Sequence, residues 1–227
     1  ETFGDWNADV AYERVPNPYE DIPAERMVEQ LDDKANAILI GGYSIPMRDT
    51  HPDYPALQLA GYMMGGGFLS SRLGNRIRNE EGLSYSVGGN FNASARDENG
   101  GFFAFAAFAP ENRDRLEEVL EEELVKAAEQ GFTEEELESG RTGFLQQLKL
   151  VRSDDGRLAG LLSSGLHLDR DLFFNAEREA RIAELTLDEI NAAVAEWLKP
   201  DAMSYAIAGD FTGDGENGEG SAPAADE

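Results

Sequence analysis

A guanidinium and a phenol that could together hold a peptide carbonyl lie seven positions apart within residues 70–87 (SSRLGNRIRNEEGLSYSV). We expect Arg78 at the end of a helix and Tyr85 near the start of the next strand, so that both side chains project from one edge of a sheet. Both groups donate hydrogen bonds, which strengthen when a carbonyl oxygen gains negative charge during hydrolysis. The spacing alone also allows a second interpretation, in which a surface arginine pairs with Glu80 or Glu81 and the tyrosine lies in the core.

Three consecutive glycines, Gly65, Gly66 and Gly67, end a helix that is expected over residues 53–64. A phosphate-binding loop does not fit, because no Gly-Lys-Ser/Thr follows them and the net charge opposes nucleotide binding. Two interpretations remain open. The glycines let the chain turn from one helix into the next, or they form a pliable loop that lines a peptide-binding site.

The residue types that bind transition metals are scarce in this chain. There is no cysteine, and the two histidines, His51 and His167, have no second histidine or glutamate at the i+4 spacing of a helical zinc motif. We therefore expect no metal ligands and no catalytic residue in this chain alone. His51 is interpreted as a turn residue and His167 as a residue packed on a helix or half-exposed there.

The composition predicts a globular domain with a strongly acidic surface. Of the 227 residues 41% are apolar, and 45 acidic against 19 basic residues give a formal charge of −26. Such a charge disfavours nucleic acid as a partner, and no apolar run is long enough to span a membrane. Because residues 1–13 contain no initiator methionine and resemble the interior of a linker, we expect a fragment or a processed product.

Hydrophobic periodicity predicts an α+β fold, an antiparallel sheet with helices packed on one face, rather than a doubly wound parallel sheet. Capping boxes at Thr133/Glu136 and Thr186/Glu189 mark two helix starts, and Pro110 opens a third helix. Strand patterns are expected over residues 36–45, 83–96, 101–109 and 202–209, and helical patterns over 53–64, 70–79 and most of 110–199.

The domain organisation is expected to have three parts. Residues 1–22 are interpreted as an extended linker lying on a surface, and residues 23–211 as a single α+β domain. Residues 212–227 form an acidic, glycine-rich tail without large apolar side chains, which we expect to be disordered.

Several motifs resemble the pitrilysin/insulinase family of zinc metallopeptidases, which includes the mitochondrial processing peptidase. The similar segments are GGGFLSSRL, Ile77-Arg78, the run from Glu81 to Val87, GFTEEELESGRTGFLQQL and AMSYAIAGDF, so the resemblance covers about residues 24–211. It implies a LuxS/processing-peptidase-like metallohydrolase fold. In that family, one of two similar domains carries zinc through His-x-x-Glu-His, and the other supplies an arginine and a tyrosine that hold the substrate.

The resemblance implies that this chain is the zinc-free half, because it lacks His-x-x-Glu-His. Arg78 and Tyr85 match the substrate-holding pair, and Gly65, Gly66 and Gly67 resemble a loop that contacts substrate. The expected partners are a peptide substrate and a zinc-bearing domain, on the same precursor or on another chain. The isolated chain is expected to be inactive, and export, for example to the periplasm, is mildly favoured.

Two other hypotheses stay open. The chain could be a catalytically silent subunit of the same fold that only makes assembly contacts, or a free-standing acidic binding module.

Overall fold

The domain is built on one five-stranded sheet, seen in a computed structural model that describes residues 10–212. The strands follow the order β1-β5-β2-β4-β3, with β1 parallel to β5 and all other neighbours antiparallel. Their bounds are β1 Arg26–Gln30, β2 Ala37–Ile45, β3 Ser84–Ala93, β4 Gly100–Phe108 and β5 Ser204–Gly209.

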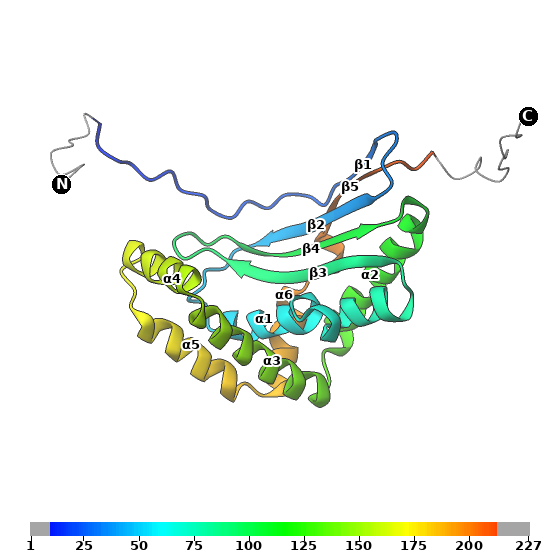
Figure 1. The fold of residues 1–227 in the computed structure, drawn as a ribbon. Helices are drawn as coiled ribbons and strands as arrows, with labels where there is room; N and C mark the ends of the chain where they lie inside the picture. The colour runs from blue at the N-terminus through cyan, green and yellow to red at the C-terminus, as the bar shows by residue number, and fades with distance from the viewer. Residues whose placement is uncertain (1–9, 213–227) are drawn as a thin grey trace, which may run out of the picture.

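The helices form a second layer beneath the sheet (Figure 1). The longer helices are α1 Tyr54–Gly61, α2 Arg113–Gln130, α3 Glu134–Ser153, α4 Asp155–His167, α5 Leu172–Glu184 and α6 Leu187–Trp197. The short helical segments are η1 Tyr62–Gly66, η2 Phe68–Ser70, η3 Gly74–Glu80, η4 Pro110–Asn112 and η5 Pro200–Ala202, of which η1 and η3 are π-helical.

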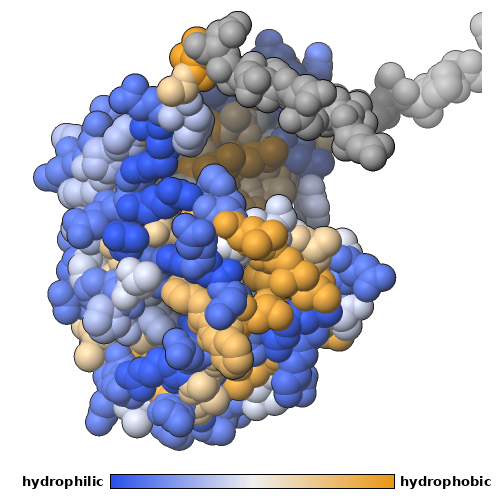
Figure 2. Space-filling view, turned by 90° about the vertical axis from the view of Figure 1, so that its left-hand side faces the viewer, coloured by the Kyte–Doolittle hydropathy of each residue, from blue (hydrophilic) through white to orange (hydrophobic). Residues whose placement is uncertain are grey.

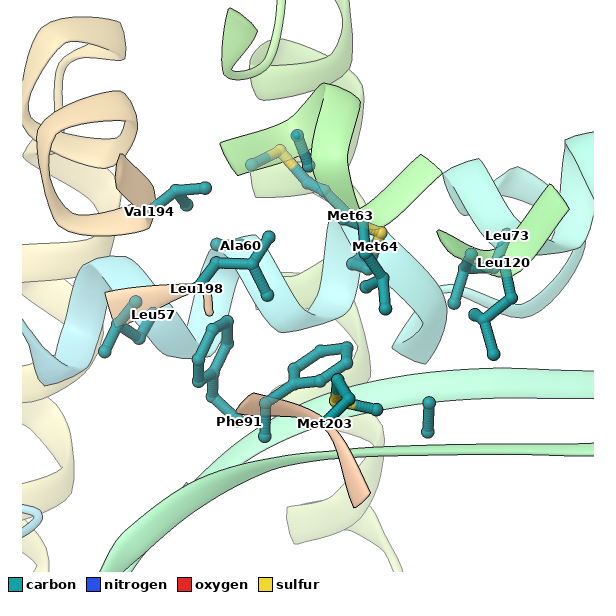
Figure 3. Packing of buried hydrophobic residues seen from close by; sticks show 14 of the residues in the cluster. Leu57, Ala60, Met63, Met64, Leu73, Phe91, Leu120, Val194, Leu198 and Met203 are labelled. Carbon is teal, nitrogen blue, oxygen red and sulfur yellow. The ribbon is translucent and has the colours of Figure 1, made fainter. Parts of the chain in front are cut away.

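The core lies between these two layers, and the opposite face of the sheet is open. In β2, Leu39 is fully buried whereas its neighbours Ile38 and Ile40 are about half exposed, as expected for a strand with one covered face. Figure 3 shows core side chains such as Leu57, Met64 and Phe91 filling the space between the helices and the strands. The one-sided burial confirms the predicted α+β class.

Two details of the predicted sheet are wrong. The strand over residues 36–45 is not the first, because β1 precedes it, and β1 runs parallel to β5, so the sheet is mixed rather than antiparallel. All five residues of β1 are exposed. Such a strand lacks the alternation of buried and exposed side chains from which strands are predicted.

Both predicted capping boxes are present and begin α3 and α6. The Thr133 hydroxyl accepts a hydrogen bond from the Glu136 amide, and the Glu136 carboxylate accepts one from the Thr133 amide. Thr186 and Glu189 repeat the arrangement. The Glu136 carboxylate also receives two hydrogen bonds from Arg72, at 2.9 and 2.8 Å, so this cap ties α3 to the segment that leads into η3.

Residues 10–25, which we call the N-terminal segment, have no regular structure and pass over the open side of the sheet (Figure 1). The segment is held at the turn between β3 and β4. Arg14 pairs with Asp97 through two hydrogen bonds of 2.7 Å, and the Asn17 amide donates to the same carboxylate. The linker predicted over residues 1–22 stays a prediction, since residues 1–9 lie outside the described part. The predicted tail lies outside it as well, apart from its first residue.

The anchor of the N-terminal segment is expected to depend on pH. The hydrogen bonds from Arg14 lower the pKa of Asp97 to about 2. The pKa of an aspartate in an unfolded chain is about 4. A carboxyl group whose pKa is lowered on folding stabilises the contact fully at pH values above that unfolded pKa, and the contribution is lost as the pH falls toward 2. Acidification over that range should release the segment, which faster amide exchange in residues 10–20 would report.

Asp97→Asn should release the segment at neutral pH without lowering the melting temperature, because the anchor lies outside the core. Glu98→Gln is the matched control, since Tyr19 bonds to the backbone oxygen of Glu98 and not to its side chain. Equal exchange rates in the two variants would contradict this account.

Candidate functional site

The glycine turn at residues 65–67 lies directly against β3. A Cβ atom on Gly65 would overlap the backbone nitrogen of Gly89 and lie only 2.7 Å from the carbonyl carbon of Gly88. Only glycine allows two backbones to approach so closely. Gly66 is exposed and Gly67 is half-buried, with its amide bonded to the Tyr62 carbonyl at 2.7 Å. The turn therefore ends η1 and also forms a wall beside the edge strand.

The structure brings Arg78 and Tyr85 together. Arg78 lies near the end of η3, the chain reverses at Gly82 with a φ of +65°, and Tyr85 follows at the start of β3. Nη1 of Arg78 donates a hydrogen bond of 3.0 Å to the backbone oxygen of Tyr85. The half-buried guanidinium is thus oriented toward the strand that carries the phenol.

A bulge at the start of β3 exposes the Tyr85 side chain. The pairing with β4 shifts between Ser84 and Ser86, which leaves Tyr85 as the extra residue. Ser84 is buried, and its hydroxyl donates to the Ala107 carbonyl at 2.7 Å and accepts from the Ser86 amide at 3.1 Å. The phenol is 59% exposed, so the alternative interpretation that placed Tyr85 in the core is wrong.

The turn between Arg78 and Tyr85 is fastened to α2 by ion pairs. Glu81 accepts two hydrogen bonds from Arg115, at 2.9 and 2.5 Å, and lies 2.7 Å from Arg76. The bonds from Arg115 hold the pKa of Glu81 below its usual value. These contacts fix the position of the turn relative to the helix layer.

A hollow of about 300 Å³ lies next to the glycine turn, on the open face of the sheet. Its aromatic wall is formed by Phe103 and Phe105 of β4, whose rings lie 6.1 Å apart and nearly parallel. The complete lining is Gly65, Gly66, Val87, Gly88, Gly89, Asn90, Phe103 and Phe105. The hollow was not predicted from the sequence, although the glycine pair at 88–89 is typical of a place where other groups approach the backbone closely.

Within residues 10–212, no group of three or more His, Asp or Glu side chains is placed to hold a metal ion. His51 accepts a hydrogen bond from the Asp53 amide at 3.2 Å and packs edge-on against Trp197. His167 ends α4 and is exposed. Both histidines lie in the turn and helix positions expected from the sequence. The described helices include none that is long and apolar enough to cross a membrane.

The fold and this site define a class of protein: an α+β domain with one open sheet face, a glycine turn against its edge strand, and no metal centre in its described part. The chain belongs to the family described as the Peptidase M16 inactive domain, whose model matches residues 1–144. The resemblance found in the sequence is thereby confirmed at the level of the family.

Several solved structures have a similar fold. The peptidase M16 inactive domain from Pseudomonas fluorescens superposes with a TM-score of 0.75 and 20% identity, covering 88% of this chain and 46% of that one. A protease from Helicobacter pylori gives a TM-score of 0.73 and 18% identity, covering 88% and 48%. The inactive peptidase domain of a proposed zinc protease from Bordetella parapertussis gives 0.63 and 20%, covering 77% and 92%.

One curated relative is similar across most of the chain. The non-peptidase homolog YmxG of Helicobacter pylori is 24% identical over 199 residues, covering 87% of this chain and 44% of the relative. The chain therefore spans a little under half the length of this relative.

Replacing Gly65 by alanine should destabilise the domain, because the added Cβ would meet the backbone of β3 rather than a side chain that can move. Overpacking of this kind lowers the free energy of unfolding by about 1–3 kcal/mol. Gly66→Ala is the matched control, since the nearest atom to its Cβ among those beyond its chain neighbours would be 3.5 Å away. Its free energy of unfolding should stay within about 0.5 kcal/mol of the wild-type value. Urea unfolding of both variants tests this, and equal stabilities would contradict the close contact.

Proposed function

We propose that this inactive M16 domain holds a peptide for cleavage at a zinc site carried by another domain or subunit. The observation that supports the proposal is the hydrogen bond between Arg78 and the Tyr85 backbone, beside an exposed Tyr85 phenol. A guanidinium and a phenol at one edge of a sheet form a pair of donors that suits a peptide carbonyl.

The bond to Tyr85 orients the guanidinium. Arginine carries five N–H donors in a rigid planar fork. The donor directed at the Tyr85 carbonyl holds the guanidinium beside β3. Hydrogen bonds to an oxygen that gains charge act mainly on the transition state, so this pair would serve turnover more than binding.

The described residues of this chain do not fit a zinc ion, so the metal chemistry is assigned to the other half. A zinc-bearing His-x-x-Glu-His domain, from the same precursor or from a partner chain, is the expected source. In this division of labour, the present chain binds and orients the peptide.

A catalytically silent assembly subunit is the second candidate. One relative carries the name of a non-peptidase homolog. In addition, apolar side chains gather on the surface at the end of the molecule formed by α4 and α5 (Figure 2). The large exposed ones there are Leu162, Leu166, Leu172 and Phe173. An exposed apolar surface of this kind is typical of a contact with another protein.

The decisive measurement is cleavage of an unfolded peptide by this chain mixed with its zinc-bearing half. Arg78→Ala and Tyr85→Phe should each lower kcat/KM, by about 100-fold for a donor that acts in the transition state. Arg113→Ala on α2 and Tyr12→Phe in the N-terminal segment are matched controls that should leave the rate unchanged.

Co-elution of the two halves should be the same for all four variants. Equal cleavage rates in every variant would refute the positioning role, and cleavage that does not need this chain at all would support the assembly subunit.

A further inference from the structure

We propose that the hollow beside β3 receives one large apolar side chain of the bound peptide, so that this half selects peptides carrying an aromatic or large aliphatic residue. The inference rests on the proposed function, because it places a specificity pocket next to the expected peptide-holding pair. It concerns different residues, chiefly Phe103 and Phe105, and can be tested separately.

The lining of the hollow suits an apolar group. Two half-exposed aromatic rings form one wall, with Phe103 at 40% and Phe105 at 38% exposure, and the backbones of four glycines form most of the remainder. Asn90 supplies the one amide side chain of the lining. A volume of about 300 Å³ is at the lower limit of ligand pockets, which matches a single side chain better than a larger ligand.

The glycines are what keep the hollow open. A Cβ on Gly88 would lie 2.8 Å from Cε1 of Phe105 and would displace the ring that forms the wall. Gly65 and Gly66 close the side toward η1 without filling it. The hollow thus exists because two neighbouring segments, η1 and β3, lack side chains at the positions that line it.

The hollow lies within reach of a peptide that is held by Arg78 and Tyr85. Gly88 follows Tyr85 by three residues on β3, which corresponds to about 10 Å along a strand. An extended peptide has the same rise per residue. When Arg78 and Tyr85 hold one peptide carbonyl, a side chain about three residues away along the peptide therefore reaches the hollow.

A peptide side chain fits this hollow better than the surface of a docked domain does. A stable protein interface buries about 800 Å² on each partner, whereas the hollow is small, concave and of side-chain volume. The occupant is therefore assigned as substrate, and docking of the zinc-bearing half becomes an outcome of the test.

The test uses fluorescein-labelled, unstructured ten-residue peptides that are identical except for one central residue, which is Phe or Ser. The whole chain should bind the Phe peptide about tenfold or more tightly than the Ser peptide, because burial of an aromatic side chain is worth at least that factor. Phe105→Ala should reduce the ratio of the two Kd values toward one. Leu150→Ala, which removes a 68% exposed side chain from α3, should leave the ratio unchanged.

A filling variant keeps the test valid if Phe105→Ala is unstable. Gly88→Ala adds a Cβ atom 2.8 Å from Cε1 of Phe105, on the side of the hollow, and should abolish the preference in a folded domain. Thermal melting of each variant shows which of them remain folded.

The outcomes separate this inference from the proposed function. If Arg78→Ala and Tyr85→Phe lower kcat/KM in the cleavage assay while the wild type shows no preference for the Phe peptide, the pocket is refuted and the positioning role stands. A preference that Phe105→Ala removes, together with a kcat/KM that Arg78→Ala and Tyr85→Phe leave unchanged in the cleavage assay, supports the pocket and refutes the positioning pair. Absence of binding to either peptide refutes both, and loss of association with the zinc-bearing half alone would assign the hollow to docking.

Discussion

The contact between the backbones of Gly65 and Gly89 is the constraint on which the rest of the site depends. It brings the end of η1 against the edge strand more closely than any side chain would allow. The chain must then return through η2 and η3 to enter β3, which places Arg78 within hydrogen-bond distance of the Tyr85 carbonyl. The same contact leaves the space between the turn and Phe105 empty. One close approach thus determines both the donor pair and the hollow beside it.

The parts of this domain that follow from local chemistry could be predicted from the sequence. Thr133 and Thr186 begin helices because each side chain and its partner glutamate satisfy amides that the first helical turn leaves unbonded. The strand patterns of β2 and β4 follow from burial on one face. Arg78 and Tyr85 could be placed at a helix end and a strand start because Gly82 marks the turn between them, although their roles in binding stay predictions.

Features that depend on distant contacts could not be predicted. The strand β1 is stabilised by pairing with β5, more than 170 residues later, and buries none of its own side chains. The bulge at Tyr85 follows from a hydroxyl of Ser84 that bonds to the Ala107 carbonyl, whereas alternation alone would let Tyr85 face the core. The hollow requires Gly65, Gly88 and Phe105 to meet, and these residues belong to three separate elements.

The distribution of charge and apolar surface is consistent with a domain that works against a partner. Apolar side chains remain exposed at the hollow on the sheet and at the end formed by α4 and α5. Exposed apolar surface ordinarily promotes self-association. A net charge of −26 makes copies of this chain repel one another, so both surfaces can stay open to other molecules. The hollow has the size of one side chain, whereas the exposed side chains at α4 and α5 come from two helices and form a broader surface.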